Sequence, residues 1–339
     1  MGVVFSVVAA LTYGTSMFLT RLGLRSKAVP PLRAVMVNLI AANLLLWSTF
    51  AVSLLFQSVT IMWNGIAYFI LAGLSAPLVG RYLGFQSIQR LGAARGSSFQ
   101  LSEMLFAAPL ALIFFDQHLT VPTVLGIVIV MVGMILFINE IRTSEVRTIP
   151  VEPETAFDPG EAAVPEGSPA VPESAQTPKV ENRTLMRRTM SYAGIGVMCG
   201  LMAGLFFAAG NLFRQAGVVA IPSAVLGSAI GTLAALVVAA AGVVRGRQVR
   251  ACLNMGSRDA TFFATSGIAS SLGMLCLFWA LDAGSPVAVV TAIKNIAPMV
   301  TFGLVAVFLS RHERITVRLG LLVVLVVFGA GLTAVGPLL

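Results

Sequence analysis

Two charged residues of opposite sign lie inside long apolar runs of the sequence. Glu103 is about eight residues into one run and Lys294 is about eight residues into another. A charged side chain at the bilayer centre costs at least ~2.5–3.5 kcal/mol on insertion scales, so both residues are candidates for function. An ion pair, or a shared aqueous cavity, would offset that cost. The pair is then either a permanent internal staple or a direct participant in substrate binding or proton coupling.

Uncharged polar side chains occur next to both charges, and others lie in the first apolar run of each half of the chain. Their amide and hydroxyl groups could hydrogen-bond a polar ligand. Together with the two charges they make up the predicted substrate-binding or coupling site: Glu103, Lys294, Asn295, Gln100, Ser102, Tyr13 and Asn211. Arg21 and Arg214 end the first run of each half, where a guanidinium is expected to snorkel to the membrane interface.

Motifs of other kinds of chemistry are missing from the sequence. The two histidines, His118 and His312, are far apart, and the three cysteines have no metal or disulfide spacing. The sequence contains no H-E-x-x-H, G-x-S-x-G or G-x-x-x-x-G-K-[ST] motif. We therefore expect no metal, no cofactor, no nucleotide hydrolysis and no enzymatic activity.

Composition defines the class of protein that must position these residues. The 339 residues are 57% apolar and only 11% charged, whereas soluble domains carry roughly a quarter charged residues. A net charge of +8 would favour nucleic-acid binding in a soluble protein. Here, however, arginine and lysine lie at the ends of apolar runs, as in membrane proteins. The expected partners are the lipid bilayer and a small-molecule substrate but no nucleic acid, and the chain is expected to be a monomer or a homodimer.

Ten apolar segments approach the ~20 residues that a membrane-spanning helix needs. They are residues 2–20, 34–56, 64–88, 95–115, 121–139, 191–212, 222–244, 260–281, 287–309 and 317–336. Together they predict an all-α polytopic membrane protein. Pro109 and Pro298 are expected to kink the two helices that carry Glu103 and Lys294. Gly196, Gly200 and Gly204 form a tandem G-x-x-x-G pattern that predicts close helix packing.

A polar stretch separates the fifth and sixth segments. Nine of the fourteen acidic residues lie between Glu140 and Glu181, among many prolines. Such a composition cannot bury enough apolar surface to offset its ordering entropy, so residues 140–190 are predicted to be a disordered tether. The tether divides the chain into residues 1–139, with helices one to five, and residues 191–339, with helices six to ten.

The two halves resemble each other at a shift of about 193 residues, over segments three to five and eight to ten. Because five is an odd number, two tandem copies must enter the membrane in opposite orientations. The sequence therefore predicts two five-helix inverted-topology repeats, an arrangement typical of secondary transporters with a binding site at the repeat interface.

Several motifs are similar to those of the EamA family of the drug/metabolite transporter superfamily. They are F-W-A-L-D-A-G-S-P-V-A-V-V at Phe278–Val290, the pair Ala297-Pro298, E-R-I-T at Glu313–Thr316 and the pair Leu119-Thr120. The resemblance implies a ten-helix fold and transport activity, without a fixed substrate signature. We expect a secondary transporter that moves a small polar, amino-acid-like metabolite by alternating access, with proton coupling as a further option. A membrane-embedded enzyme and a non-transporting channel or scaffold are the alternatives.

The distribution of basic residues predicts the orientation in the membrane. Twenty of the twenty-two arginines and lysines lie in the odd-numbered loops, the tether and their flanks, with Arg81 among them. By the positive-inside rule these loops and the tether are cytoplasmic, and both termini are outside the cytoplasmic (inner) cell membrane. The family resemblance implies the opposite placement, with both termini inside.

Overall fold

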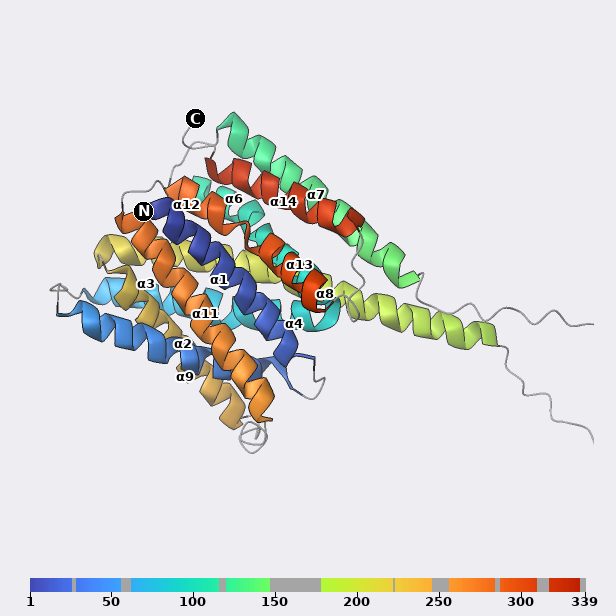
Figure 1. The fold of residues 1–339 in the computed structure, drawn as a ribbon, viewed down its shortest axis with the longest axis horizontal. Coiled ribbons are helices and arrows are strands. Elements are labelled where there is room, and N and C mark those ends of the chain that lie inside the picture. The colour runs from blue at the N-terminus through green and yellow to red at the C-terminus, as the bar shows by residue number, and fades with distance from the viewer. Residues whose placement is uncertain are drawn as a thin grey trace, which may run out of the picture.

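The protein is an all-helical bundle in the part of the chain that the structure describes. The computed structural model describes residues 1–25, 29–55, 62–115, 120–146, 178–221, 223–245, 256–283, 287–309 and 317–335. Eight stretches of these residues are long and apolar enough to cross a membrane. The helices run across the molecule in roughly the same direction or its opposite (Figure 1). The chain is thus a multi-pass membrane protein.

The first half of the chain folds into a succession of helices. They are α1 (Gly2–Gly23), α2 (Pro31–Ser53), α3 (Trp63–Gly73), the π-helix η1 (Leu74–Gly80), α4 (Arg81–Leu91), α5 (Ala93–Ser98), the 3-10 helix η2 (Phe99–Ser102), α6 (Glu103–Phe115) and α7 (Val121–Val146). The second half contains α8 (Pro178–Ala220), α9 (Ala224–Arg245), α11 (Ser257–Asp282), α12 (Val287–Lys294), α13 (Ala297–Phe308) and α14 (Val317–Val335).

Each of the ten predicted apolar segments overlaps described helices, but the segments are not all single helices. Segment 64–88 corresponds to α3, η1 and α4 in direct succession, a candidate span of 29 residues. Segment 95–115 is divided among α5, η2 and α6 and does not count among the eight candidate spans. The apolar part of α14, Val317–Leu332, is shorter than those spans.

The helices on either side of the predicted tether are longer than the sequence indicated. α7 continues to Val146 instead of ending at residue 139, and α8 begins at Pro178 instead of residue 191. Both extensions lack internal proline and consist largely of residues that a helix accommodates. Proline at the first position of α8 is favourable because its missing N–H would be unsatisfied there anyway. The remainder of the predicted tether, residues 147–177, lies outside the described residues.

Two of the predicted segments are interrupted next to the predicted charges. In the first, η2 directly precedes Glu103. In the second, Asn295 and Ile296 form a turn between α12 and α13, directly after Lys294. Pro298 lies in the first turn of α13, as expected for a proline-marked break. The expected kink at Pro109 is not where the first interruption lies, since α6 continues through that proline.

Helices from the two halves pack against each other throughout the bundle. α1 packs on α11, whereas α8 packs on α3, η1 and α4. α2 contacts both α9 and α11, and α7 pairs with α14. Figure 1 shows that α1 begins and α14 ends at one end of the molecule, whereas α7 ends and α8 begins at the opposite end.

The predicted close packing of the α8 glycines is confirmed. A Cβ atom on Gly196 would lie 2.9 Å from Leu91 Cγ, and one on Gly200 would lie 2.6 Å from Phe99 Cβ. At Gly204 the Cβ would lie 2.0 Å from the Ser102 hydroxyl oxygen. Only hydrogen fits at such contacts, so α8 lies directly against α4, η2 and the start of α6.

Candidate functional site

Glu103 and Lys294 meet inside the bundle. The Lys294 Nζ atom lies 3.8 Å from Glu103 Oε1, and the side chains are 23% and 13% exposed respectively. Glu103 is the first residue of α6 and Lys294 is the last of α12. The partial negative charge of a helix C-terminus favours the Lys294 ammonium, whereas Glu103 directly follows η2 and its backbone N–H donates to Gln100 O. The ion pair that the sequence predicted is therefore present, and the end of α12 favours its cationic partner.

Asn211 connects this ion pair to a second cation. Its Nδ2 donates to Glu103 Oε1 at 2.5 Å, and its Oδ1 accepts a hydrogen bond from Arg214 Nη1 at 3.0 Å. Residues 211 and 214 share a face of α8 because they are one helical turn apart. Arg214 is half-buried and interacts electrostatically with Tyr13 and Glu103. The expectation that Arg214 snorkels to the interface is therefore wrong, since its guanidinium points into the protein.

Arg81 is a further cation that sequence reasoning placed elsewhere. It was assigned to a cytoplasmic flank, but it begins α4 inside the candidate span Trp63–Leu91. Its Nη1 donates to Asn38 Oδ1 at 2.5 Å. Asn38 Nδ2 in turn donates to Phe263 O at 3.3 Å and to Ser266 Oγ at 3.2 Å. The signal that could have revealed Arg81 was its interruption of the third apolar segment.

Tyr13 lies near these charged groups. It is half-buried on α1 and lies within electrostatic range of Arg214, Arg81 and Glu103. We refer to the whole set as the central cluster: Tyr13, Arg81, Glu103, Asn211, Arg214 and Lys294. The central cluster draws its side chains from α1, α4, α6, α8 and α12, and thus from both halves of the chain.

Three other predicted site residues occupy different positions. Asn295 is 2% exposed at the turn after Lys294, and its buried Nδ2 has no hydrogen-bond partner in the described part of the chain. Gln100 lies against α4, since its Nε2 would be 3.2 Å from a Cβ atom on Gly84. Ser102 is buried and donates to Leu201 O at 3.5 Å, so it serves helix packing.

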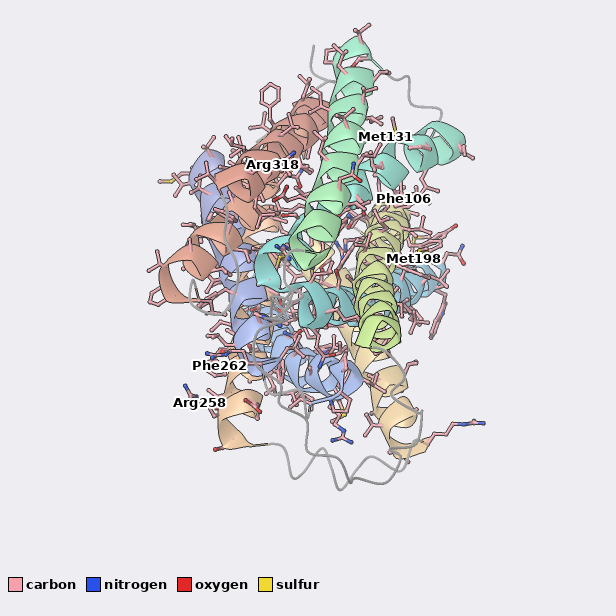
Figure 2. The ribbon with its side chains drawn as sticks, turned by 90° about the vertical axis from the view of Figure 1, so that its right-hand side faces the viewer. Phe106, Met131, Met198, Arg258, Phe262 and Arg318 are labelled. Atoms are coloured by element: carbon pink, nitrogen blue, oxygen red, sulfur yellow. The ribbon has the colours of Figure 1, made fainter. Side chains whose placement is uncertain are left out.

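The charge balance of the central cluster is unequal. Among the described residues it contains three cations, Arg81, Arg214 and Lys294, but one carboxylate, Glu103. Two arginines outside the central cluster lie at the surface and have partners of their own. Arg318 is 74% exposed and pairs with Glu140 at 3.3 Å. The Arg258 guanidinium lies 5.8 Å from the centre of the Phe262 ring. Figure 2 shows Arg258 at the edge of the bundle and Arg318 on α14 beside α7.

No group of three or more metal-ligating side chains occurs in the described ranges. His118, His312 and Cys252 lie outside those ranges. The arrangement of the central cluster is suited to binding charged and hydrogen-bonding groups.

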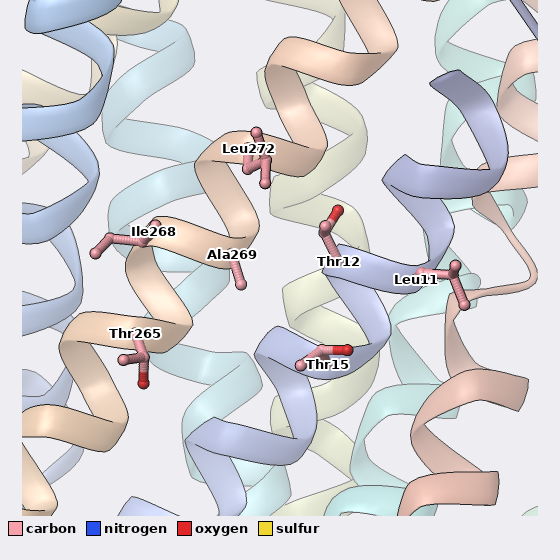
Figure 3. Close-up of a pocket in the computed structure, with 7 residues that line it drawn as sticks. All are labelled: Leu11, Thr12, Thr15, Thr265, Ile268, Ala269 and Leu272. Atoms are coloured by element: carbon pink, nitrogen blue, oxygen red, sulfur yellow. The ribbon is translucent and has the colours of Figure 1, made fainter. Parts of the chain in front are cut away.

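A separate groove lies between α1 and α11, with a volume of about 300 Å³ (Figure 3). Its lining consists of apolar side chains and threonines: Leu11, Thr12, Thr15, Thr265, Ile268, Ala269 and Leu272. The Thr12 and Thr265 hydroxyls donate to carbonyls of their own helices, which leaves the groove mostly apolar. Since Leu11 and Ile268 are exposed, the groove faces the expected lipid side and is not part of the central cluster.

Comparison with known proteins agrees with the resemblance found in the sequence. Residues 1–139 match the model of the EamA-like transporter family, which confirms the similarity to the EamA family. This chain is similar to the chain in a solved crystal structure, with a TM-score of 0.52 and 13% sequence identity. The match covers 96% of this chain and 95% of the chain in that structure. At that identity the likeness establishes the fold alone. The search of curated proteins found no match.

Proposed function

We propose that this chain is a secondary transporter that moves a small polar metabolite across the cytoplasmic membrane by alternating access. The observation that carries the proposal is the contact of Glu103 with Lys294 and Asn211. It joins α6, α8 and α12 at two helix interruptions inside the bundle. Interrupted helices at the interface of two repeats are the typical binding site of secondary transporters.

The packing supports two five-helix repeats, residues 1–139 and 191–339, joined by the tether 140–190. If α1 corresponds to α8 and the unit α3–η1–α4 to α11, the contacts of one half recur in the other. α1 packs on α11 and on α12–α13, just as α8 packs on α3–η1–α4 and on η2–α6. Both interruptions then fall in corresponding helices.

Two close contacts between helices support the same correspondence of the two halves at the level of single residues. A Cβ atom on Gly73 would lie 2.0 Å from Gly231 O, and one on Gly267 would lie 2.2 Å from Asn38 O. Residues 73 and 267 differ by 194 in number, and residues 38 and 231 differ by 193. This is the shift at which the two halves resemble each other in sequence, so the two contacts occupy equivalent positions.

Alternating access requires that the site favour different arrangements with and without substrate. The Lys294–Glu103 pair is suited to this because a polar substrate can compete for either partner. Protonation of Glu103 would likewise weaken its attraction for Lys294, which gives a route for proton coupling. An internal staple would instead keep the pair closed in all states.

Transport by the reconstituted full chain tests the proposal against the staple. We expect Glu103→Gln and Lys294→Met each to abolish uptake of metabolites into proteoliposomes while the protein remains folded in the membrane. Loss of uptake should persist in the double variant. Full activity of both single variants would contradict the proposal. Unfolded single variants that the double variant rescues to full activity would show that the pair is only a staple.

A further inference from the structure

We propose that the transported substrate is a small organic anion whose carboxylate or phosphate group binds between Arg81 and Arg214. The inference rests on the proposed transport function and narrows its substrate class. A small zwitterion, which the sequence suggested, would leave the positive charge of the central cluster uncompensated.

The two guanidiniums contact neutral acceptors. Arg81 donates to the Asn38 side-chain oxygen and Arg214 to that of Asn211. Within the described ranges neither forms an ion pair with a carboxylate, whereas Lys294 pairs with Glu103 and Arg318 with Glu140. Arg81 and Arg214 lie on α4 and α8, which pack against each other, and they are close enough to repel each other electrostatically.

The Glu103 carboxylate does not balance these charges. One of its oxygens already faces the Lys294 ammonium and accepts from Asn211. Its remaining attraction for Arg214 acts at longer range. Two guanidiniums without paired carboxylates are costly in a membrane interior, and such residues usually mark a substrate pathway. An anion bound between them would remove their mutual repulsion.

The hydrogen-bonding groups match an oxyanion. A guanidinium presents its N–H donors as a rigid planar fork that fits carboxylate and phosphate oxygens. Tyr13 lies within range of both arginines and offers a hydroxyl. At the turn after Lys294, the buried Asn295 Nδ2 is a donor without a partner in the described residues. Since buried donors are rarely left unpaired, Asn295 can serve a second polar group of the same ligand.

Matched pairs of ligands test the inference on the purified full-length protein. The probes are succinate with succinamide, glutamate with glutamine, and glycerol 3-phosphate with glycerol, each at constant ionic strength. A ligand selective for the folded state raises the unfolding temperature according to its concentration and affinity. We expect at least one anion, but none of the neutral partners, to stabilise the protein.

Arginine variants show whether the anion binds at the proposed place. In Arg81→Gln and Arg214→Gln, the anion concentration that gives half of the maximal rise in unfolding temperature should increase at least tenfold. The matched control, Arg258→Gln, removes an exposed cation on α11 and should respond like the wild type. Removal of one repelling cation should leave the protein folded. If the glutamine variants do not fold, Arg81→Lys and Arg214→Lys are used instead. They keep the positive charge but lose the planar guanidinium, and they should weaken anion binding to the same extent.

Several results would overturn the inference. They are equal stabilisation by a neutral compound, an unchanged anion response in both arginine variants, and no response of the wild type to any anion. Uptake of the same compounds into proteoliposomes separates this inference from the proposed function. Anion binding without uptake would refute transport but keep the site, whereas uptake of neutral compounds alone would keep transport and refute the anionic substrate.

Discussion

Glu103 is held at the centre of a small network of charges and amides. Lys294 faces one of its oxygens, and Asn211 donates to the same oxygen while accepting from Arg214. Asn211 thus links the Glu103 carboxylate to the Arg214 guanidinium through two hydrogen bonds. A neutral amide suits this role because it has both a donor and an acceptor.

Replacement of Asn211 by the similarly sized leucine should therefore affect both stability and transport. The change removes two hydrogen bonds and leaves charged partners less satisfied, so we expect unfolding to become easier by about 1–3 kcal/mol and transport to be lost. The matched control is Asn43→Leu, which removes contacts to Leu39 and Thr232 outside the central cluster. It should destabilise the protein to a similar extent but keep transport. Equal transport rates in the two variants would contradict the role given to Asn211.

At the scale of the helices, the position of η2 and of the start of α6 depends on the close approach of α8. Gly204 lies against Ser102, and a Cβ atom there would also lie 2.7 Å from the backbone nitrogen of Glu103. Any side chain at residue 204 must therefore displace η2 and the start of α6. The position of the Glu103 carboxylate follows from this helix contact.

Gly204→Ala should consequently destabilise the protein by about 1–3 kcal/mol, the usual cost of overpacking, and lower transport. Gly194→Ala is the matched control on the same helix, since a Cβ atom there would meet nothing within 4 Å. This control should be neutral or slightly stabilising, because alanine is the better helix former. Thermal unfolding in detergent and uptake measurements on both variants check the prediction. Identical behaviour of the two variants would contradict the described packing.

The sequence allowed accurate prediction of those features that depend on local composition. Long apolar runs located the helices, and opposite charges in corresponding runs predicted the pairing of Glu103 with Lys294. The interruption before Glu103 was missed because Phe99–Ser102 carries no proline. At Pro109 the helix loses one hydrogen bond without ending there.

The two arginines were misplaced for geometric reasons. Arg81 was counted among the basic residues of a cytoplasmic flank although it lies within the predicted segment 64–88, and the helical stretch continues past it for 29 residues in all, through a π-helix. The direction of Arg214 depends on the rotation of α8 about its own axis, which its contacts with α3, α4 and α6 determine. Neither property is encoded in the hydropathy of the segment itself.

For the whole molecule, the opposite ends of the bundle carry different parts of the chain. The start of α1 and the end of α14 lie at one end, and the tether-flanking ends of α7 and α8 lie at the other (Figure 1). Most arginines and lysines occur in the loops and flanks on the tether side, even after Arg81 is assigned to the membrane interior. We therefore propose a cytoplasmic tether and termini outside.

Protease accessibility in oriented vesicles checks this topology. A specific cleavage site inserted near residue 160 should be cut in inside-out vesicles and protected in right-side-out vesicles. The same site placed before Met1 serves as the control and should show the opposite pattern. Cleavage of the residue-160 site only in right-side-out vesicles would reverse the orientation and restore the termini to the cytoplasm, as the family resemblance implied.

The most direct test of the central claim, alternating access through the Glu103–Lys294 site, is counterflow in proteoliposomes. Vesicles are loaded with an unlabelled compound that stabilises the purified protein, and entry of the labelled compound is followed. A carrier returns loaded and so accumulates label transiently, which an open channel does not. We predict a transient overshoot for the wild type and none for Glu103→Gln or Lys294→Met. Absence of the overshoot in the wild type, or an undiminished overshoot in both variants, would contradict the account.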